Sequence, residues 1–341
     1  PESLDLQRYL REMVDVGVEY ALLEVSSHSL ILKRTIDCDF NCGIFTNLTQ
    51  DHLDFHGTID GYLEAKKQLF IQLNSSKKRG KVAVINEDDP ASLVLKSAIL
   101  TEILTFGLKP SADIRAEDIK IRSDGLSFKI MTPWGKLQVL SPLIGRYNVY
   151  NILAAVACTL VEGVSKDDIV EGIANLKRVS GRFESIKCGQ PFSVVVDYAH
   201  TDDALKNVLQ AARELTKKRV ITVFGCGGDR DKGKRPLMGE VAGEYSDYVI
   251  ITSDNPRSED PLMIIDEIEK GVLKSRGSKG YIIIPDRYEA IKYALDMVHE
   301  GDMLLIAGKG HETGQLIRNN ILPFDDREVA REILNVKSNN R

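Results

Sequence analysis

The sequence has 341 residues, of which 43% are hydrophobic and 28% are charged, and its formal net charge is −5. This length and composition predict a globular protein with two ordinary domains, each able to bury its own core. The weak negative charge, with Lys and Arg spread along the chain, argues against nucleic acid as the main partner, and no apolar run approaches the ~20 residues of a membrane span.

The beginning of the chain is unusual for an α/β domain. A helical pattern over Leu4–Val16 runs almost directly into an apolar run at Tyr20–Val25, and no initiator Met precedes Pro1. We therefore expect a chain that is truncated on its N-terminal side. The first 20 residues do not have the pattern of a signal peptide. The scattered, odd number of cysteines predicts reduced thiols in a cytoplasmic protein; they are Cys38, Cys42, Cys158, Cys188 and Cys226.

The first half predicts a mixed α/β domain. Its predicted strands are Glu19–Val25, Asn41–Asn47, Lys81–Asn86 and Glu102–Phe106, and its predicted helices include Ile59–Leu73. The segment Asp113–Leu143 changes character, because short alternating runs surround the turn signals Ser123–Gly125 and Pro133–Gly135. We expect an antiparallel insertion there, followed by a long helix from Tyr147 to Glu162.

The second half alternates short β-branched runs with amphipathic helical patterns, which predicts parallel βαβ units and a doubly wound sheet. The predicted strands are Phe192–Asp197, Arg219–Gly225, Asp247–Thr252, Tyr281–Pro285 and Asp302–Ala307, and the predicted helices are Asp203–Leu215, Pro261–Leu273 and Tyr288–Val298. The polar, glycine-containing segment Lys177–Phe183 marks the domain boundary. The predicted domains are therefore residues 1–178 and 179–341.

Three chemistry-bearing side chains cluster near predicted strand ends in the first half. Glu24 ends a buried run, His52 follows the next strand, and Lys66 lies on the helix after it. Such a set is compatible with Mg²⁺, which takes few protein ligands and keeps water and phosphate for its other positions. The spacing alone equally allows a capping carboxylate, a turn histidine and a solvated lysine.

The sequence also contains two cysteines and two histidines in an order that resembles a zinc finger. Cys38 and Cys42 are followed by His52 and His56 with similar spacings. The intervening segment is shorter than usual and contains the apolar strand Gly43–Phe45, and Cys42 begins that strand rather than lying on a knuckle turn. We do not expect structural zinc.

Four predicted strand ends in the second half carry polar loops. The loops begin at Asp197, Gly225, Asp254 and Gly308, and ligands of open parallel sheets bind beyond the carboxyl ends of the strands. Arg230 and Arg257 can pair bidentately with a carboxylate, whereas Asp254 and Glu312 can hold an ammonium group. Both signs of charge in one cleft predict a zwitterionic ligand; the alternative is a set of surface ion pairs.

Two nucleotide-binding motifs are nearly matched and rejected. The run Gly228-x4-Gly233-Lys234 resembles a P-loop, but Arg235 stands where Ser or Thr would bind Mg²⁺. A loop that presents Arg230 to an anion is the better interpretation. A dehydrogenase fingerprint also fails, because Gly225-x-Gly227 is not followed by its third glycine.

Nine strings, taken together and in order, resemble the Mur ligases, most closely the MurE type. They are Glu24-Val-Ser-Ser-His28, Phe45-Thr-Asn-Leu48 with Asp51-His-Leu-Asp54, Tyr62-x-x-Ala-Lys66, Asn148-x-x-Asn151, Ser180-Gly-Arg182, Asp197-Tyr-Ala-His-Thr201, Gly225-Cys-Gly-Gly-Asp-Arg230, Asp254-Asn-Pro-Arg257 and Gly308-Lys-Gly-His-Glu312. The resemblance implies three domains, of which the UDP-binding N-terminal domain and the P-loop at the start of the central ATPase domain are missing here. What remains would be the rest of a P-loop-type central domain and a doubly wound, Rossmann-like C-terminal domain.

The resemblance also implies roles for individual residues. Glu24, His52 and Lys66 would be the catalytic set that binds Mg²⁺, with Lys66 carbamylated to N6-carboxylysine; a buried lysine loses its proton readily, as this reaction requires. Ser26 and Arg34 would contact the UDP-muramoyl dipeptide. The nucleotide would lie against Asn148, Asn151, Arg182, Asp197 and His200, and the amino-acid pocket would comprise Arg230, Asp254, Asn255, Pro256, Arg257, Gly308 and Glu312.

By this resemblance the parent enzyme is an ATP-dependent ligase of peptidoglycan precursor synthesis. It would add meso-2,6-diaminopimelate to UDP-N-acetylmuramoyl-L-alanyl-D-glutamate through an acyl phosphate, in the cytoplasm and as a monomer, with no membrane insertion. Arg257 favours diaminopimelate over lysine, because lysine would leave its guanidinium without an anion, and a buried unpaired charge is costly. A lysine-adding sister ligase and a non-catalytic amino-acid-binding fragment remain the alternatives, and we expect this chain alone to be inactive.

Overall fold

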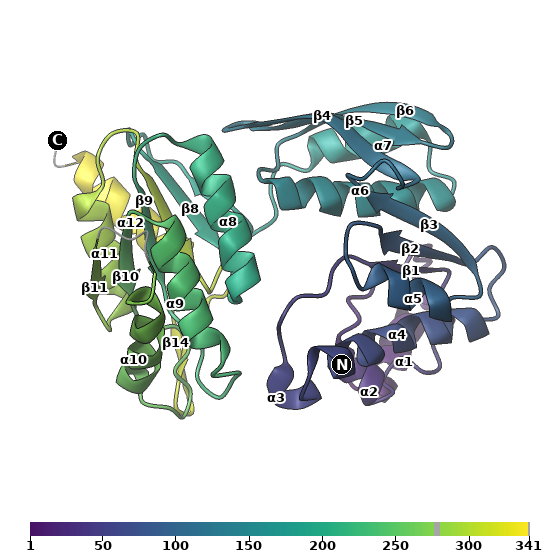
Figure 1. Ribbon diagram of the computed structural model, residues 1–341, viewed down its shortest axis with the longest axis horizontal. Coiled ribbons are helices and arrows are strands. Elements are labelled where there is room, and N and C mark those ends of the chain that lie inside the picture. Colours follow the sequence, from purple (N-terminus) through teal and green to yellow (C-terminus); the bar gives the residue numbers. More distant parts are fainter. Residues whose placement is uncertain (276–279, 340–341) are drawn as a thin grey trace. The chain divides into compact units, whose positions relative to one another are not determined.

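The computed structural model describes residues 1–275 and 280–339. The chain divides into two units (Figure 1). The first comprises residues 1–118, 129–138 and 150–170, and the second comprises residues 119–128, 139–149 and 171–341. Because the units interleave between residues 119 and 170, the single domain boundary at residue 178 stays a prediction.

The first unit contains a short parallel sheet covered by helices. Its elements are α1 (Ser3–Asp15), α2 (Ser27–Ile31), β1 (Cys42–Phe45), α3 (Leu53–His56), α4 (Ile59–Ser75), β2 (Val82–Asn86), α5 (Ser92–Ala98) and β3 (Glu102–Gly107). The strand β2 pairs in parallel with β1 and β3. The side chains of Phe70 and Leu73 on α4 and Leu95 on α5 pack against Ile85 of β2 in one apolar cluster. The predicted helices and all but one of the predicted strands are therefore confirmed.

The predicted strand Glu19–Val25 is wrong. Residues 18–26 have no regular secondary structure, and the side chains of Tyr20 and Leu22 are 58% and 89% exposed. An apolar run becomes a strand only where a neighbouring strand accepts and donates its backbone hydrogen bonds. No strand within residues 1–275 and 280–339 pairs with this segment, so its apolar composition is not sufficient.

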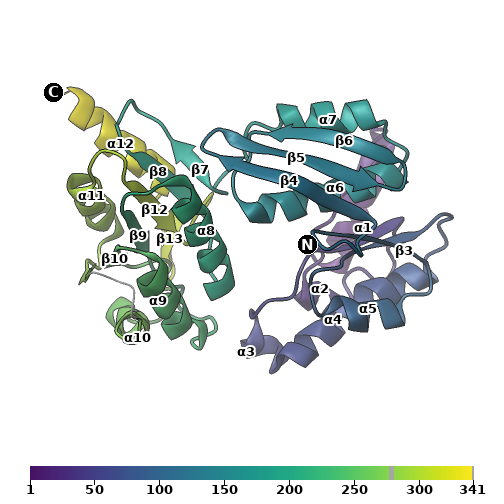
Figure 2. The ribbon, with the colours of Figure 1, turned by 45° about the horizontal axis from the view of Figure 1, so that its top comes forward.

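The predicted insertion is a meander of three strands. They are β4 (Ile114–Arg122), β5 (Gly125–Thr132) and β6 (Gly135–Ser141), which lie side by side in Figure 2. The sheet order is β1-β2-β3-β4-β5-β6. Two-residue turns join successive strands, which is a connection only antiparallel strands allow. The helices α6 (Arg146–Val161) and α7 (Lys166–Asn175) follow, and α6 confirms the predicted long helix.

The second unit is built on a six-stranded sheet with the order β11-β10-β9-β12-β8-β7. Its strands are β7 (Glu184–Ile186), β8 (Ser193–Asp197), β9 (Val220–Phe224), β10 (Tyr248–Ile251), β11 (Tyr281–Ile283) and β12 (Met303–Ala307). All pairs are parallel except β7 with β8. Every strand predicted in this half is confirmed, and β7 is an additional antiparallel edge.

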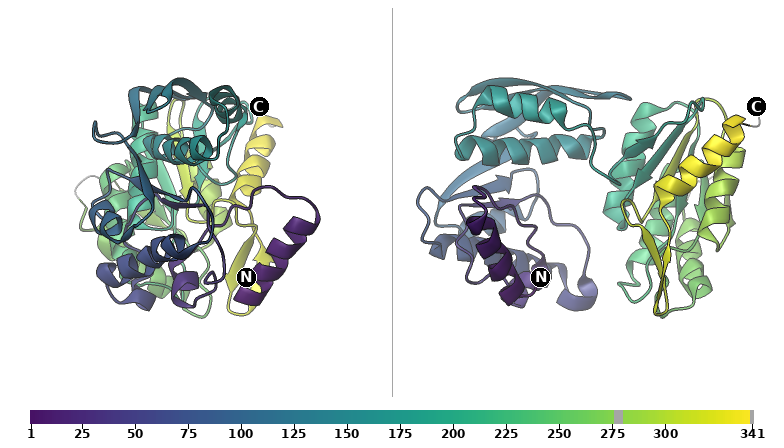
Figure 3. Two further views of the ribbon diagram at one scale, coloured as in Figure 1. Left: turned by 90° about the vertical axis from the view of Figure 1, so that its right-hand side faces the viewer. Right: turned by 180° about the vertical axis from the view of Figure 1, so that it is seen from behind.

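Helices cover both faces of this sheet. On one side lie α8 (Asp202–Leu215), α9 (Lys234–Tyr245) and α10 (Pro261–Val272), and on the other lie α11 (Arg287–Met297) and α12 (Asp326–Asn339), the latter clear in the right-hand view of Figure 3. Successive residues of β9 alternate between the two cores: Val220 and Phe224 face one, Ile221 and Val223 the other. Because these strands are buried on both faces of the sheet, they appear in the sequence as continuous apolar runs. A two-stranded hairpin, β13 (Gly314–Ile317) with β14 (Asn320–Pro323), lies outside the sheet.

We predict that Leu305→Ala in the central strand β12 lowers the free energy of unfolding by about 2–5 kcal/mol, because it leaves a cavity in a fully buried site. Urea denaturation measures this change. The matched control is Leu273→Ala at the end of α10, where the side chain is 64% exposed and the expected change is within about 0.5 kcal/mol. Equal effects of the two substitutions would contradict the assignment of the core.

Candidate active site

The loops after β9, β10 and β12 meet at the carboxyl edge of the second sheet, as their neighbouring positions in the sheet require. A Cβ atom on Gly225 would lie 2.2 Å from the backbone oxygen of Thr252, and one on Gly308 would lie 2.7 Å from Oδ2 of Asp254. The structure therefore brings the predicted residues Asp254 and Gly308 into direct contact. Only glycine permits this approach.

Glu312 is held by a hydrogen-bond network at this edge. Its Oε2 accepts hydrogen bonds from Nδ2 of Asn255 (2.8 Å) and from Nζ of Lys309 (3.0 Å). Burial alone would raise the pKa of Glu312, but these donors, together with the positive charges of Lys309 and Arg257, lower it. Glu312 is thus an anion in the site, as an ammonium-binding role requires.

Lys309 is a site residue that the sequence analysis missed. Its side chain is fully buried, and its Nζ also donates to Oδ1 of Asn255 (3.2 Å) and to the backbone oxygen of Gly314 (2.7 Å). A buried lysine is rare unless it is paired. Its place in the Gly308-Lys-Gly-His-Glu312 string was the available signal, but no pattern in the sequence indicates its burial.

Arg257 has a strained backbone that β13 holds in place. Its φ is +52°, a left-handed conformation that bulky residues seldom adopt. Its N–H donates to the backbone oxygen of Leu316 (3.0 Å), and its own oxygen accepts from the N–H of Arg318 (2.6 Å). Strain of this kind is a frequent feature of ligand-binding positions.

The guanidinium of Arg257 turns toward the glycine loop after β9. Its Nη1 donates to the backbone oxygen of Gly228 (2.7 Å). A Cβ on Gly227 would lie 2.7 Å from Nη1 of Arg257 and 3.8 Å from Cγ of Arg230, so the two arginines flank one glycine. A Cβ on Gly228 would lie 1.9 Å from the backbone oxygen of Pro256. The predicted binding of one carboxylate by both Arg230 and Arg257 stays a prediction that this spacing allows.

Arg235 explains why the P-loop-like run is not a phosphate site. The residue lies on α9 with its side chain buried, where it donates to Glu259 through Nη1 (3.1 Å) and Nη2 (2.8 Å) and to Glu267 through Nη1 (2.8 Å). A further bond from Nη2 reaches the backbone oxygen of Gly227 (3.2 Å). The hydrogen bonds from Arg235 are the main cause that lowers the pKa of Glu259 to about 2. Arg235 thus fixes the glycine loop from behind.

A second group of predicted residues gathers at the end of β8. The guanidinium of Arg182 lies over the ring of Tyr198, with its Cζ 4.7 Å from the ring centroid, and the ring of His200 is 4.6 Å from that of Tyr198. The buried carboxylate of Asp197 accepts N–H bonds from Phe183 (2.6 Å) and Ala199 (2.8 Å). Cation and aromatic faces side by side suit a nucleotide.

The predicted adenine residues lie on α6. The side chain of Asn148 is buried, and its Nδ2 donates to the backbone oxygen of Ile144 (2.7 Å); Asn151 follows one turn later. The adjacent Tyr147 has a pKa raised by burial and then by the charge of Asp197, which places it close to the end of β8. Asn148, which follows Tyr147 on α6, therefore lies near the group of residues at the end of β8.

In the first unit, Lys66 lies in an acidic and aromatic environment. Its Nζ is 4.8 Å from the ring centroid of Tyr62. Burial lowers the pKa of Lys66, although the nearby carboxylates of Asp51, Glu24 and Asp89 raise it in part. A partly buried amine with a lowered pKa fits carbamylation, and the carboxylates provide the oxygen ligands that Mg²⁺ prefers.

His52 lies close to this group, at the start of α3. It has a φ of +56°, its ring centroid is 4.9 Å from that of His28, and its Nε2 is 3.4 Å from Oδ2 of Asp51. In the described part of the chain, no three His, Cys, Asp or Glu side chains are arranged to hold a metal ion. A carbamate on Lys66 would add one anionic oxygen ligand to the carboxylates of this group.

The two residues predicted to contact the muramoyl dipeptide lie at either end of α2. Oγ of Ser26 caps the helix by accepting the N–H of Ser29 (3.2 Å). The guanidinium of Arg34 donates to Glu2 through Nη2 (2.6 Å), and its Nε is buried without a partner. Arg34 therefore keeps an unused donor for an anion.

The rejected zinc site is not formed. Cys38 accepts a hydrogen bond from Gln7, with Nε2 3.7 Å from its Sγ, and Cys42 lies against the thiol of Cys158 rather than His52 or His56. All five cysteines are free thiols.

Asp197 provides a pH test of the second group. Burial raises its pKa to about 6 from an ordinary 3.8. Because the folded state favours the protonated form, this stabilisation is full below pH 3.8 and is lost as pH rises through about 6. We predict that the free energy of unfolding of the wild type, relative to Asp197→Asn, falls by about 3 kcal/mol over this range.

Denaturation at a series of pH values measures that difference. The exposed Asp266→Asn variant controls for the loss of one negative charge. If the free energies of unfolding of the wild type and of Asp197→Asn changed in parallel with pH, the raised pKa of Asp197 would be refuted.

Comparisons with known proteins agree with this geometry. Residues 1–159 match the Mur ligase middle domain, and residues 181–310 match the Mur ligase glutamate ligase domain. The UDP-N-acetylmuramoyl-L-alanyl-D-glutamate–2,6-diaminopimelate ligase of Geobacillus kaustophilus is 50% identical over 333 residues, which cover 97% of this chain and 68% of that protein. The corresponding protein of Bacillus licheniformis is 48% identical over 340 residues, 99% of this chain and 69% of that one.

Solved structures give the same result. A UDP-N-acetylmuramoyl-L-alanyl-D-glutamate–2,6-diaminopimelate ligase aligns with a TM-score of 0.65 at 39% identity, over 99% of this chain and 69% of that chain. The MurF ligase of Thermotoga maritima, in complex with ADP, aligns with a TM-score of 0.66 at 19% identity, over 92% and 65%, and so shares the fold. In residues 1–275 and 280–339, no helix is long and apolar enough to cross a membrane. The chain belongs to the Mur ligase family.

Proposed function

We propose that this chain carries the amino-acid-selecting and metal-binding parts of an ATP-dependent ligase that adds meso-2,6-diaminopimelate to UDP-N-acetylmuramoyl-L-alanyl-D-glutamate. The observation that carries the proposal is a set of neighbouring loops, at the carboxyl edge of the second sheet, that carry both signs of charge. The carboxylate of Asp254 lies beside Gly308, that of Glu312 accepts a hydrogen bond from Asn255, and the cations Arg230 and Arg257 flank Gly227. The names and 48–50% identities of the relatives support the same substrate.

The pocket fits an amino acid with a second zwitterionic centre. Arg257 and Arg230 would bind the distal carboxylate, since a guanidinium pairs with both oxygens of a carboxylate. Asp254 and Glu312 would bind the distal ammonium group. Lysine offers an ammonium but no carboxylate at that end, and would leave Arg257 without its anion.

The reaction would proceed through an acyl phosphate. The D-glutamyl carboxylate would attack the γ-phosphate of ATP in line and release ADP, and the neutral amine of diaminopimelate would then displace phosphate from the acyl group and lose a proton as the amide forms. The chain would position the substrates and would form no covalent bond with them. Its pocket fixes the distal end of the amino acid so that the reacting amine approaches in one orientation.

Nucleotide and metal would use the other two groups of residues. Arg182, Asp197, His200, Asn148 and Asn151 would bind ATP. Glu24, His52 and carbamylated Lys66 would hold Mg²⁺, which when bound neutralises the phosphate oxygens and orients them for transfer. Ser26 and Arg34 would bind the muramoyl dipeptide.

We further propose that the protein acts in the cytoplasm as a monomer, with domains at residues 1–178 and 179–341. The absence of a basic block disfavours nucleic acid as a partner. A lysine-adding activity, or amino-acid binding without catalysis, would be recognised by the experiments below.

We predict that Arg257→Met weakens binding of meso-diaminopimelate by about 30- to 1,000-fold, which corresponds to about 2–4 kcal/mol for one lost partner of a buried charge pair. The affinity for L-lysine should rise, because the substitution removes the guanidinium that lysine leaves unpaired. Isothermal titration calorimetry of this chain with each amino acid measures both. Arg318→Met is the matched control, because Arg318 also has a positive φ (+53°) but is exposed.

Tight lysine binding by the unsubstituted chain would favour the lysine-adding ligase instead. Diaminopimelate binding without product, even when ATP, Mg²⁺ and the muramoyl dipeptide are supplied, would indicate a non-catalytic binding protein.

Lys66 can be tested for carbamylation directly. We predict that the chain, equilibrated with ¹³C-bicarbonate above neutral pH, gives a carbamate carbon signal in its NMR spectrum, because a lowered pKa leaves more of the amine neutral. The signal should disappear in Lys66→Gln and persist in Lys67→Gln, its neighbour on α4. A carbamate signal that survives Lys66→Gln would refute the modification at this position.

A further inference from the structure

A fully buried ion pair lies directly behind the amino-acid pocket. Arg287 is the first residue of α11 and Asp326 is the first residue of α12. Nε and Nη2 of the guanidinium donate to the two carboxylate oxygens at 2.8 and 2.7 Å, and both side chains have 0% exposure. Neither residue belongs to the strings that carry the family resemblance.

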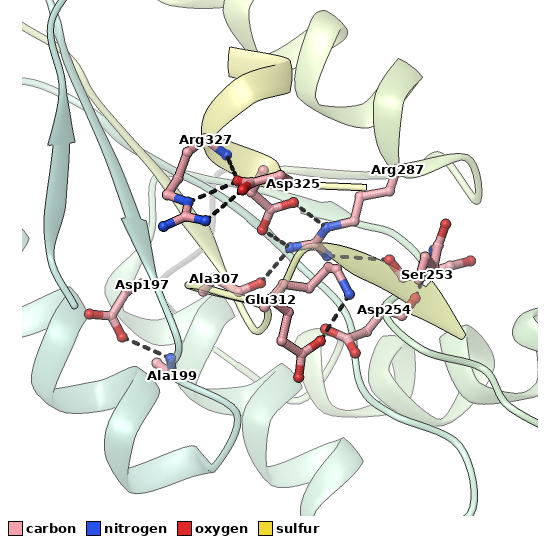
Figure 4. Close-up of polar contacts among 12 residues, drawn as sticks. Asp197, Ala199, Ser253, Asp254, Arg287, Ala307, Glu312, Asp325 and Arg327 are labelled. Carbon is pink, nitrogen blue, oxygen red and sulfur yellow. Dashed lines mark hydrogen bonds and ion pairs between the residues drawn. The ribbon is translucent and has the colours of Figure 1, made fainter. Parts of the chain in front are cut away.

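The same guanidinium binds the backbones of two pocket loops (Figure 4). Its Nη1 donates to the oxygen of Ser253 (3.2 Å) and its Nη2 to the oxygen of Ala307 (2.9 Å). Ser253 immediately precedes Asp254, and Ala307 immediately precedes Gly308. One rigid side chain thereby connects the carboxyl ends of β10 and β12.

Stability alone does not explain this arrangement. A cation at the first position of a helix opposes the helix dipole, and a buried ion pair often stabilises a fold no more than an apolar pair of similar volume would. What an apolar pair could not supply is the two hydrogen bonds to the loop carbonyls. Because Gly308 and Asp254 already lie in contact, a small displacement of either loop would change the pocket.

We propose that the Arg287–Asp326 pair is a positioning element, which sets the distance between the loop of Asp254 and the loop of Gly308 and Glu312. Asp326 orients the guanidinium, and Arg287 fixes both loop backbones. This inference rests on the proposed function for its ligand, meso-diaminopimelate. Its structural part, the fixed separation of the two loops, stands without a ligand.

The test replaces the ion pair by an apolar pair, Arg287→Met with Asp326→Leu. The double variant avoids an uncompensated buried charge, so it should remain folded, as circular dichroism will show. We expect its affinity for meso-diaminopimelate to fall at least about tenfold, as for a displaced binding group. We also expect faster hydrogen exchange at the amides of Gly308 and Leu316, which bond to the oxygen of Asp197 and to Oδ1 of Asn255.

The matched control is Arg219→Met, at the opposite end of the sheet. Arg219 pairs with Asp302 through Nε (3.0 Å) and donates from Nη2 to the backbone oxygen of Met297 (3.0 Å), far along β12 from the pocket. Its loss should lower stability without changing affinity or exchange at the two amides. If the double variant does not fold, Asp326→Asn serves in its place, with a smaller change in the same direction expected.

A folded variant with wild-type exchange at Gly308 and Leu316 would overturn the proposal, whatever its affinity. If the wild type itself does not bind meso-diaminopimelate while exchange still increases in the variant, the proposed function fails and the positioning role stands. If Arg219→Met changed the affinity and the exchange at the two amides equally, the Arg287–Asp326 pair would have only a structural role, and the proposal would also be overturned.

Discussion

The pocket depends on how closely three loop backbones approach one another. At Gly225, Gly228 and Gly308 a Cβ atom would lie within 2.7 Å of an atom of the loop after β10. These distances are shorter than any side chain tolerates, so the loops behave as one packed surface rather than as independent connections. The loops that carry the groups assigned to the amino acid are therefore held by backbone contacts at Gly225 and Gly228 and by the side chain of Asp254 at Gly308.

The charges of the pocket are held by other charges behind it. Lys309 supports Asn255 and Glu312, Arg235 supports the glycine loop, and Arg287 supports the strand ends. Each of these buried cations also donates to at least one backbone oxygen. A buried charge is costly unless it is paired and hydrogen-bonded, so a displacement of the loop backbones would remove bonds that these cations need. The positions of the loop backbones and the burial of these three cations therefore depend on each other.

Sequence patterns predicted the second unit well for a physical reason. Strands buried on both faces appear as continuous β-branched runs, and their helices have a clear amphipathic period, so local composition is enough. The loops at strand ends were predicted because Gly, Asp and Arg gather there directly after apolar strands. The segment Glu19–Val25 failed because strand formation depends on a partner elsewhere in the chain. Arg287, Lys309 and Arg235 were missed because burial of a cation is decided by tertiary contacts, and the positive φ of Arg257 has no sequence signal.

The residues assigned to amino-acid binding and those assigned to the metal lie in different units. Every group assigned to the amino acid, from Arg230 to Glu312, lies in the second unit, together with the three buried cations that support it. The groups assigned to Mg²⁺ lie in the first. Recognition of the incoming amino acid can therefore be complete within one packed sheet edge, whatever the state of the metal site. Under the proposed function, such a site would select by the fit of two opposite charges before any bond forms, and it would discriminate against lysine because lysine leaves Arg257 unpaired.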